Sequence, residues 1–203
     1  MIVFYYICIL SSSLPLIIQI LFKKKKAINS FDRFFFSLVL IRFLSDIFGV
    51  YFDLYFKNAY PVFHISVLLE TIIYLQLLMI DSLKIQRRFL HLMQIVVFLV
   101  TVYLLLNDGF WKSNWISSIT LHFIILIFYF IFILKKPKYI HIIQSQFYTT
   151  VLFYTIVYLP YLLFSKIIRQ NLDLFLFVWP VILLLILIFN LSFARISWLI
   201  RKN

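Results

Sequence analysis

Seven long apolar runs divide this chain. Each has about 20 mostly apolar residues, the length that an α-helix needs to cross a hydrocarbon layer ~30 Å thick. The runs cover residues 2–22, 34–56, 61–83, 89–106, 115–134, 146–164 and 174–194. Hydrophobic residues make up 65% of the chain, whereas about half is usual in soluble domains. The sequence therefore predicts an all-α, polytopic integral membrane protein with seven transmembrane helices.

Lysine and arginine are distributed unequally between the two ends of these runs. Fourteen of the nineteen basic residues follow the first, third, fifth and seventh runs, and only four follow the second, fourth and sixth. Basic residues mark the cytoplasmic side, so we expect the N-terminus outside and the C-terminus inside. The abundance of Phe, Ile, Lys and Asn is typical of AT-rich bacterial genomes, which favours the bacterial cytoplasmic (inner) membrane as the location.

The segments between the runs are too short to fold alone, so we expect one transmembrane domain over residues 1–203. The net charge of +12 would suggest nucleic-acid binding in a soluble protein. Here the positive-inside rule and the anionic lipids of the inner leaflet account for most of it. We therefore expect membrane lipids, including anionic inner-leaflet lipids, and a cytoplasmic protein as partners, and no nucleic acid. Assembly into an oligomer stays open.

Few side chains in the sequence suit catalysis or metal binding. The only cysteine is Cys8, and the four histidines lack the spacing that zinc sites use. No nucleophile elbow, phosphate loop or metallopeptidase motif occurs. The sequence therefore predicts a non-enzymatic protein without a cofactor or a metal. An intramembrane enzyme that uses Asp46 and Glu70 is the alternative.

Charged residues inside two neighbouring apolar runs indicate a site. Arg42 and Asp46 lie four residues apart on one face of the second predicted helix, where they are able to pair, and Glu70 lies in the third. In an antiparallel hairpin, Asp46 comes level with Glu70 at ~15 Å below the outer surface, near the middle of the membrane. Two acids and one arginine at that depth are expected to share one proton, because burial opposes isolated charges. The predicted ligand- or proton-binding polar core is Arg42, Asp46, Asp53, His64, Glu70 and Tyr74. A purely structural ion cluster that joins the two helices is the alternative.

Three tyrosines follow one face of the sixth predicted helix at helical spacing. Pro160 and Pro180 lie in the outer halves of the sixth and seventh predicted helices, where prolines usually bend a helix. Two bends at similar depth could open an outward-facing cleft, although ordinary interhelical packing explains the same pattern. The candidate lining residues are Tyr154, Tyr158, Tyr161 and Asn190.

A short motif follows the second predicted helix, with the residues Asn58-x-x-Pro61-x-x-His64 and then Glu70-x-x-x-Tyr74. Phe147-Tyr148 begins the sixth predicted helix, and Asn190 lies in the last. In these positions the chain resembles small seven-helix membrane proteins of Bacteroidota. Some of those proteins are genetically linked to soluble histidine kinases, so the resemblance implies a sensory role.

The leading hypothesis is a membrane sensor or signalling partner that acts through another chain. Its cytoplasmic contact would involve Lys84, Arg87, Arg88 and the tail through Lys202, with solvated anchors at the membrane surface as the alternative role of these residues. The second hypothesis is a small transporter or channel with the mid-membrane arginine and acids as its site, although the chain has only two glycines and no matched pair of broken helices. The third is a membrane accessory of a bacterial defence locus of the CRISPR type.

Overall fold

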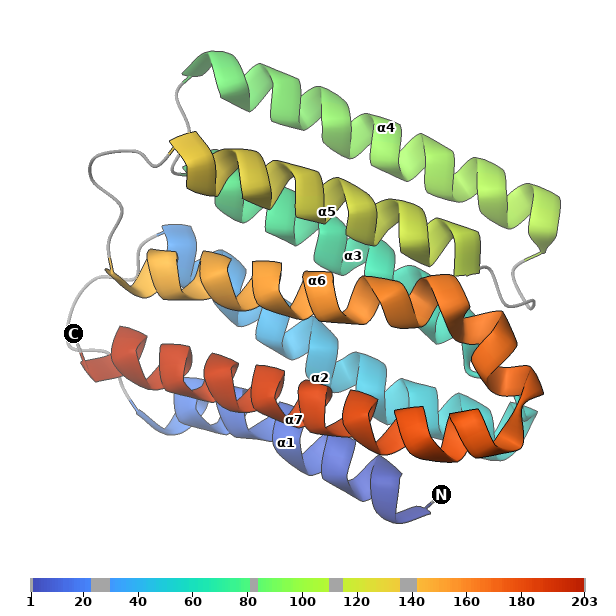
Figure 1. The fold of residues 1–203 in the computed structure, drawn as a ribbon. Coiled ribbons are helices and arrows are strands. Elements are labelled where there is room, and N and C mark those ends of the chain that lie inside the picture. The colour runs from blue at the N-terminus through green and yellow to red at the C-terminus, as the bar shows by residue number, and fades with distance from the viewer. Residues whose placement is uncertain (1, 23–29, 81–83, 110–114, 136–141, 203) are drawn as a thin grey trace.

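The computed structural model of this protein describes residues 2–22, 30–80, 84–109, 115–135 and 142–202, and the elements among them are all helical. Figure 1 shows these helices side by side in one bundle, with successive helices running in opposite directions. They are α1 (Ile2–Leu21), α2 (Ser30–Phe56), α3 (Tyr60–Ile80), α4 (Lys84–Asp108), α5 (Trp115–Lys135), α6 (Ile142–Gln170) and α7 (Leu172–Lys202). Each predicted apolar run corresponds to one helix. Several helices are longer than their runs, because helical structure continues into the polar residues at the ends.

Five of the described helices are long and apolar enough to cross a membrane. Their candidate spans are Ser30–Phe56, Tyr60–Leu78, Arg87–Asn107, Ile142–Phe164 and Leu172–Lys202. α1 and α5 contribute the shorter apolar stretches Tyr6–Leu21 and Ser118–Phe130. Large apolar side chains such as Leu10, Leu99 and Phe177 are exposed on the outside of the helices. Since water-soluble proteins rarely expose so continuous an apolar surface, these features indicate an integral membrane protein.

The turn between α2 and α3 follows local backbone chemistry. Lys57 adopts a left-handed conformation with φ of 55°, which ends α2. The Asn58 Oδ1 then accepts a hydrogen bond of 2.9 Å from the Tyr60 N–H at the start of α3. Pro61 occupies the first turn of α3, as its sequence position predicts, because a missing N–H costs nothing there.

The turn between α6 and α7 is shorter still. Asn171 alone separates the two helices, and its Oδ1 accepts a hydrogen bond of 3.1 Å from the Leu174 N–H, which caps α7. Pro160 and Pro180 lie inside α6 and α7. α6 turns sharply toward its end in Figure 1, as the prolines predict for this region.

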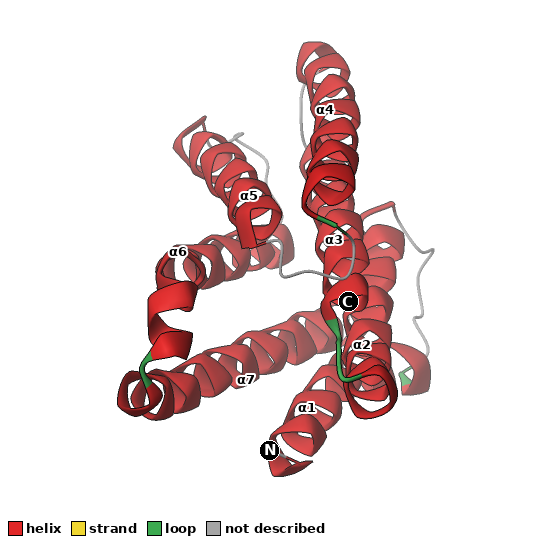
Figure 2. Cartoon of the chain, turned by 90° about the vertical axis from the view of Figure 1, so that its right-hand side faces the viewer, coloured by secondary structure: helices red, strands yellow, loops and turns green. Residues whose placement is uncertain are grey.

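Six of the helices form a ring in the order α1, α2, α3, α5, α6 and α7, and α7 closes it against α1. α4 packs on the outside of this ring against α3 and α5, as Figure 2 shows. The starts of α2, α4 and α6 lie at the same end of the bundle as the C-terminus, which we call the C-terminal end. The start of α1 lies at the opposite, N-terminal end.

Aromatic rings from five helices fill the C-terminal half of the ring. Phe147 of α6 packs edge-on against Phe35 of α2, with ring centroids 5.7 Å apart, and lies 5.7 Å from Phe193 of α7. Tyr74 and Tyr129 extend this packing to α3 and α5. These five side chains, which we call the aromatic core, are almost completely buried. They hold α2, α3, α5, α6 and α7 together at one level.

Candidate functional site

An ion pair joins the second and third helices just beyond the aromatic core. The Arg42 Nη1 of α2 donates a hydrogen bond of 2.8 Å to the Glu70 Oε2 of α3. The two side chains are only 15% and 17% exposed. Buried charges cost several kcal/mol unless they are paired, so each residue stabilises the other. The expected pairing of Arg42 with Asp46 is not formed, because the guanidinium turns to the neighbouring helix.

Aromatic rings of α6 and α7 also pack against the Arg42 guanidinium. Its central carbon lies 4.6 Å from the centroid of the Phe189 ring, 5.7 Å from Tyr154 and 6.0 Å from Phe193. Cation–π attraction of this kind is worth ~2 kcal/mol or more when it is shielded from water. Arg42 therefore connects the α2–α3 pair to the α6–α7 pair. Its buried Nε has no hydrogen-bond partner among the described residues.

Two hydroxyl-bearing side chains of α1 extend these polar contacts around the ring. Ser12 interacts with the half-buried carboxyl group of Asp46. Its neighbour Ser11 accepts a hydrogen bond of 2.9 Å from the Asn190 Nδ2 of α7. Asp46 therefore lies next to α1 as well as near the Arg42–Glu70 pair, with which it interacts electrostatically. Polar contacts consequently join α3, α2, α1 and α7 at middle depth.

The predicted polar core is divided in the structure. Tyr74, which was expected to be level with Arg42, is buried and interacts with the guanidinium. Asp53 and His64 lie farther toward the N-terminal end. His64 is buried, and its ring centroid lies 6.5 Å from that of Tyr60. At ~1.5 Å per residue, His64 is ~9 Å along α3 from Glu70, and Asp53 is ~16 Å along α2 from Arg42.

The tyrosine row of α6 forms a continuous stack. Tyr154 and Tyr158 have ring centroids 5.2 Å apart and nearly parallel planes, and Tyr161 follows at 5.6 Å. Tyr158 also contacts the His122 ring of α5 at 5.3 Å. Asn190 is not part of this stack, because its side chain points to α1. The outward-facing cleft proposed for these residues stays a prediction.

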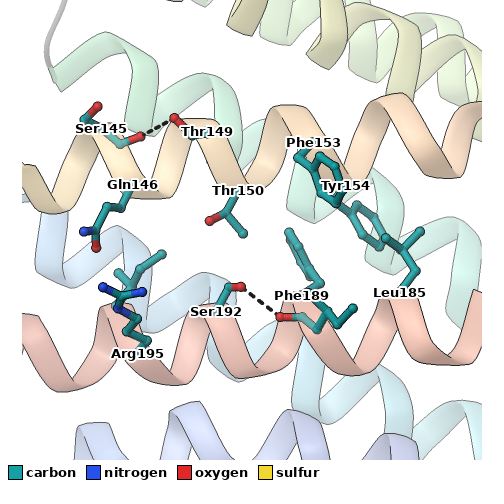
Figure 3. A pocket seen from close by; sticks show the side chains of 12 residues that line it. Ser145, Gln146, Thr149, Thr150, Phe153, Tyr154, Leu185, Phe189, Ser192 and Arg195 are labelled. Atoms are coloured by element: carbon teal, nitrogen blue, oxygen red, sulfur yellow. Dashed lines mark hydrogen bonds between the residues drawn. The ribbon is translucent and has the colours of Figure 1, made fainter.

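A groove of about 400 Å³ opens between α6 and α7 in the C-terminal half of the bundle. Tyr154 lines it, whereas Tyr158, Tyr161 and Asn190 do not. Figure 3 shows Gln146 and Thr150 of α6 facing Ser192 and Arg195 of α7 across the groove. Phe189 and Tyr154, the same rings that cover Arg42, form part of its wall. Two aromatic side chains thus separate the buried arginine from the groove.

Sequence reasoning missed Ser11, Ser12, Phe189 and the groove. A signal existed for the serines, because three in succession in an apolar helix favour a close interhelical contact. Phe189 gave none, since it is one of twenty-five phenylalanines in the chain.

No group of three or more potential metal ligands gathers among the described residues. Comparison with protein-family models, with curated proteins and with solved structures finds no match to this chain.

Proposed function

We propose that this protein is a non-enzymatic sensor or signalling partner of the bacterial inner membrane. All seven helices span the bilayer, with the N-terminus outside and the C-terminus inside. The observation that carries the proposal is the position of Arg42. It pairs with Glu70 of α3 and lies against aromatic rings of α6 and α7. Its contacts therefore depend on the relative positions of four helices, α2, α3, α6 and α7.

The surroundings of this arginine favour sensing over transport. A transport site needs a path along which an ion or a substrate enters and leaves. Phe189, Tyr154 and Phe193 instead pack against the guanidinium that pairs with Glu70. A change in proton occupancy of Glu70, or a small shift of α6 against α2, would alter the ion pair. The helices would then carry that change to the C-terminal end of the bundle.

Reporter fusions test the proposed topology. Fusions after Lys26, Arg88, Lys138 and Lys202 should report the cytoplasm, and fusions after Lys57, Lys112 and Asn171 should report the outside. Asn171 is the fusion site between the last two helices, because α6 continues to Gln170. Two consecutive fusions on the same side would remove a transmembrane helix and overturn the orientation.

Affinity purification from mildly solubilised membranes tests the signalling role. Arg87 and Arg88 are exposed in the first turn of α4, at the C-terminal end of the bundle, so they suit the contact with a cytoplasmic protein that the sequence predicts. Reversing both charges, as R87E and R88E, should remove that protein. The matched control K57E changes one exposed charge in the turn at the opposite end and should leave binding intact. Identical partners for all three proteins would count against the proposal.

A further inference from the structure

The groove between α6 and α7 combines two kinds of surface along its length. Its deeper part is apolar and includes Leu185, Ile188 and Phe189. Toward the C-terminal end it carries polar side chains and one cation. These polar lining residues are Ser145, Gln146, Thr149, Thr150, Ser192 and Arg195. Its volume of about 400 Å³ falls within the range of small-molecule sites, roughly 300–1,000 Å³.

Arg195 is the cation of this groove, and its side chain is exposed. No carboxylate of the described residues lies within ion-pair distance of it. The guanidinium therefore has donors available for an anionic group, and phosphate is the anion that its planar fork fits best.

The other polar groups of the groove accept hydrogen bonds. The Ser192 hydroxyl donates to the Ile188 carbonyl at 2.9 Å, and the Thr149 hydroxyl donates to the Ser145 carbonyl at 2.9 Å. Each hydroxyl oxygen keeps lone pairs for a further donor. The Gln146 Oε1 is buried and has no partner among the described residues. A ligand that suits this groove thus carries hydroxyl donors next to an anionic phosphate.

The depth of Arg195 also matches a lipid headgroup. α7 has 31 residues and is ~46 Å long, which exceeds a ~30 Å hydrocarbon core by ~8 Å at each end. Arg195 lies seven residues before Lys202, or ~10 Å from the end of the helix, so it falls at the hydrocarbon boundary. Leu185 and Ile188 lie deeper, at the level of acyl chains. In the proposed orientation this boundary belongs to the inner leaflet, which carries anionic lipids.

From these observations we propose that the α6–α7 groove is a specific site for an anionic phospholipid with a hydroxyl-bearing headgroup. Arg195 binds the phosphate, Gln146 and Ser192 accept hydrogen bonds from the headgroup hydroxyls, and an acyl chain lies along Ile188 and Phe189. Because Phe189 and Tyr154 also cover Arg42, the bound chain presses on the rings that hold the buried ion pair. The leaflet rests on the orientation given under the proposed function, but the site itself does not.

Thermal unfolding of the purified full-length protein in neutral detergent micelles tests this site. Added phosphatidylglycerol should raise the melting temperature in a saturable manner. Phosphatidylcholine, which lacks both the net negative charge and the headgroup hydroxyls, should have little effect. Soluble glycerol phosphate should also have little effect, because it lacks the acyl chain. An equal shift with phosphatidylcholine or with glycerol phosphate would overturn the proposal.

Two variants and one control locate the site. R195Q should raise the half-saturating phosphatidylglycerol concentration about tenfold, which corresponds to about 1.4 kcal/mol. Q146L should raise it by a smaller factor and leave the melting temperature without lipid nearly unchanged. R88Q makes the same charge change at an exposed arginine outside the groove and should behave like the wild type. If R88Q weakens binding as much as R195Q, the effect is general surface charge and the groove is not the site. Lipid binding in micelles is measured without a protein partner. A negative result would therefore overturn the lipid site but not the signalling role, which the affinity purification tests separately.

Discussion

The two halves of the bundle are packed differently, and the buried arginine lies between them. In α2, Phe31, Phe35, Leu38 and Val39 are buried near the C-terminal end, but beyond Val39 the structure describes only Gly49 as buried. α7 has the matching pattern in reverse, because its described buried residues begin at Ile182. The C-terminal half is therefore a dense aromatic core, whereas in the N-terminal half α2 and α7 bury few side chains.

This difference indicates where the molecule is able to move. Regions with few buried contacts open at lower free-energy cost than densely packed ones. The α2–α3 and α6–α7 turns lie on opposite sides of the bundle in the view from the N-terminal end (Figure 2). Arg42 is the first charged contact that joins the two helix pairs beyond the aromatic core. A displacement of α2 or α7 in the N-terminal half would therefore change the contacts of Arg42 before it changed those of the aromatic core.

The largest effect is expected at the boundary itself. R42A leaves Glu70 buried without its cation and should lower the free energy of unfolding by about 3–5 kcal/mol. The loss should be greater at pH 8 than at pH 5, because Glu70 is neutralised more readily by a proton at the lower pH. Thermal unfolding in detergent at both pH values measures this difference. R88A, which removes an exposed arginine, is the matched control.

Replacing the whole cluster separates loss of charge from loss of structure. The triple variant R42L, D46L, E70L should recover much of the stability lost in R42A, since removing all partners leaves no unpaired charge. Equal destabilisation by R42A at pH 5 and pH 8 would show that these residues do not act as one cluster.

A pair of phenylalanines tests the comparison of the two halves directly. F147A removes a completely buried ring from the aromatic core and should cost about 3–5 kcal/mol. F177A removes a ring that is 75% exposed in the N-terminal half of α7, and the expected change is within about 0.5 kcal/mol. Unfolding in detergent compares the two variants. Similar losses would mean that the aromatic core contributes no more to stability than an exposed ring does.

The hydrogen bond between α1 and α7 should have a smaller effect. N190L removes the donor to Ser11 and should cost about 0.6 kcal/mol, and at most about 1.7 kcal/mol, as for other polar contacts between membrane helices. S192A is the matched control, because the Ser192 hydroxyl bonds only within its own helix among the described residues. Melting temperatures of the two variants decide whether this bond anchors α1. A greater loss from S192A would refute that role.

At Gly49 a substitution is expected to have the opposite sign. A Cβ at this position would lie 3.9 Å from the Phe63 Cζ, which is ordinary van der Waals contact. G49A should therefore stabilise the protein by about 0.5–1 kcal/mol through the lower entropy of alanine in the unfolded chain. A loss of stability would show that α2 and α3 approach more tightly in the N-terminal half than the comparison implies.

The helices were predictable because a single physical rule sets their length. An apolar run long enough to cross hydrocarbon has to satisfy its backbone hydrogen bonds internally, so 34–56 and 61–83 became helices close to the expected positions. Their exact ends were less predictable, since polar residues beyond the apolar run continue the helix in α6 and α7. The α2–α3 turn was an exception, because Pro61 marked the helix start.

The candidate site was predictable only in part. Periodicity placed Arg42 near Asp46 within one helix, and the hairpin placed Glu70 close by. Which acid the guanidinium contacts depends on side-chain direction and on the neighbouring helix, and neither can be read from spacing. The contact of Phe189 with Arg42 depends on how α7 is placed in the ring of helices, and no local sequence pattern specifies that placement. Ser12 was missed although three successive serines in an apolar helix favour a close interhelical contact.

The single residue between α6 and α7 has a consequence for how the chain is made. In the proposed topology, a link of one residue does not allow α6 to reach its final position across the bilayer before α7 has been synthesised. At synthesis rates of 5–20 residues per second, the 31 residues of α7 take roughly 2 to 6 s to emerge. In the topology proposed above, the two helices should therefore enter the bilayer together as a hairpin, with Asn171 at the tip that crosses the membrane first.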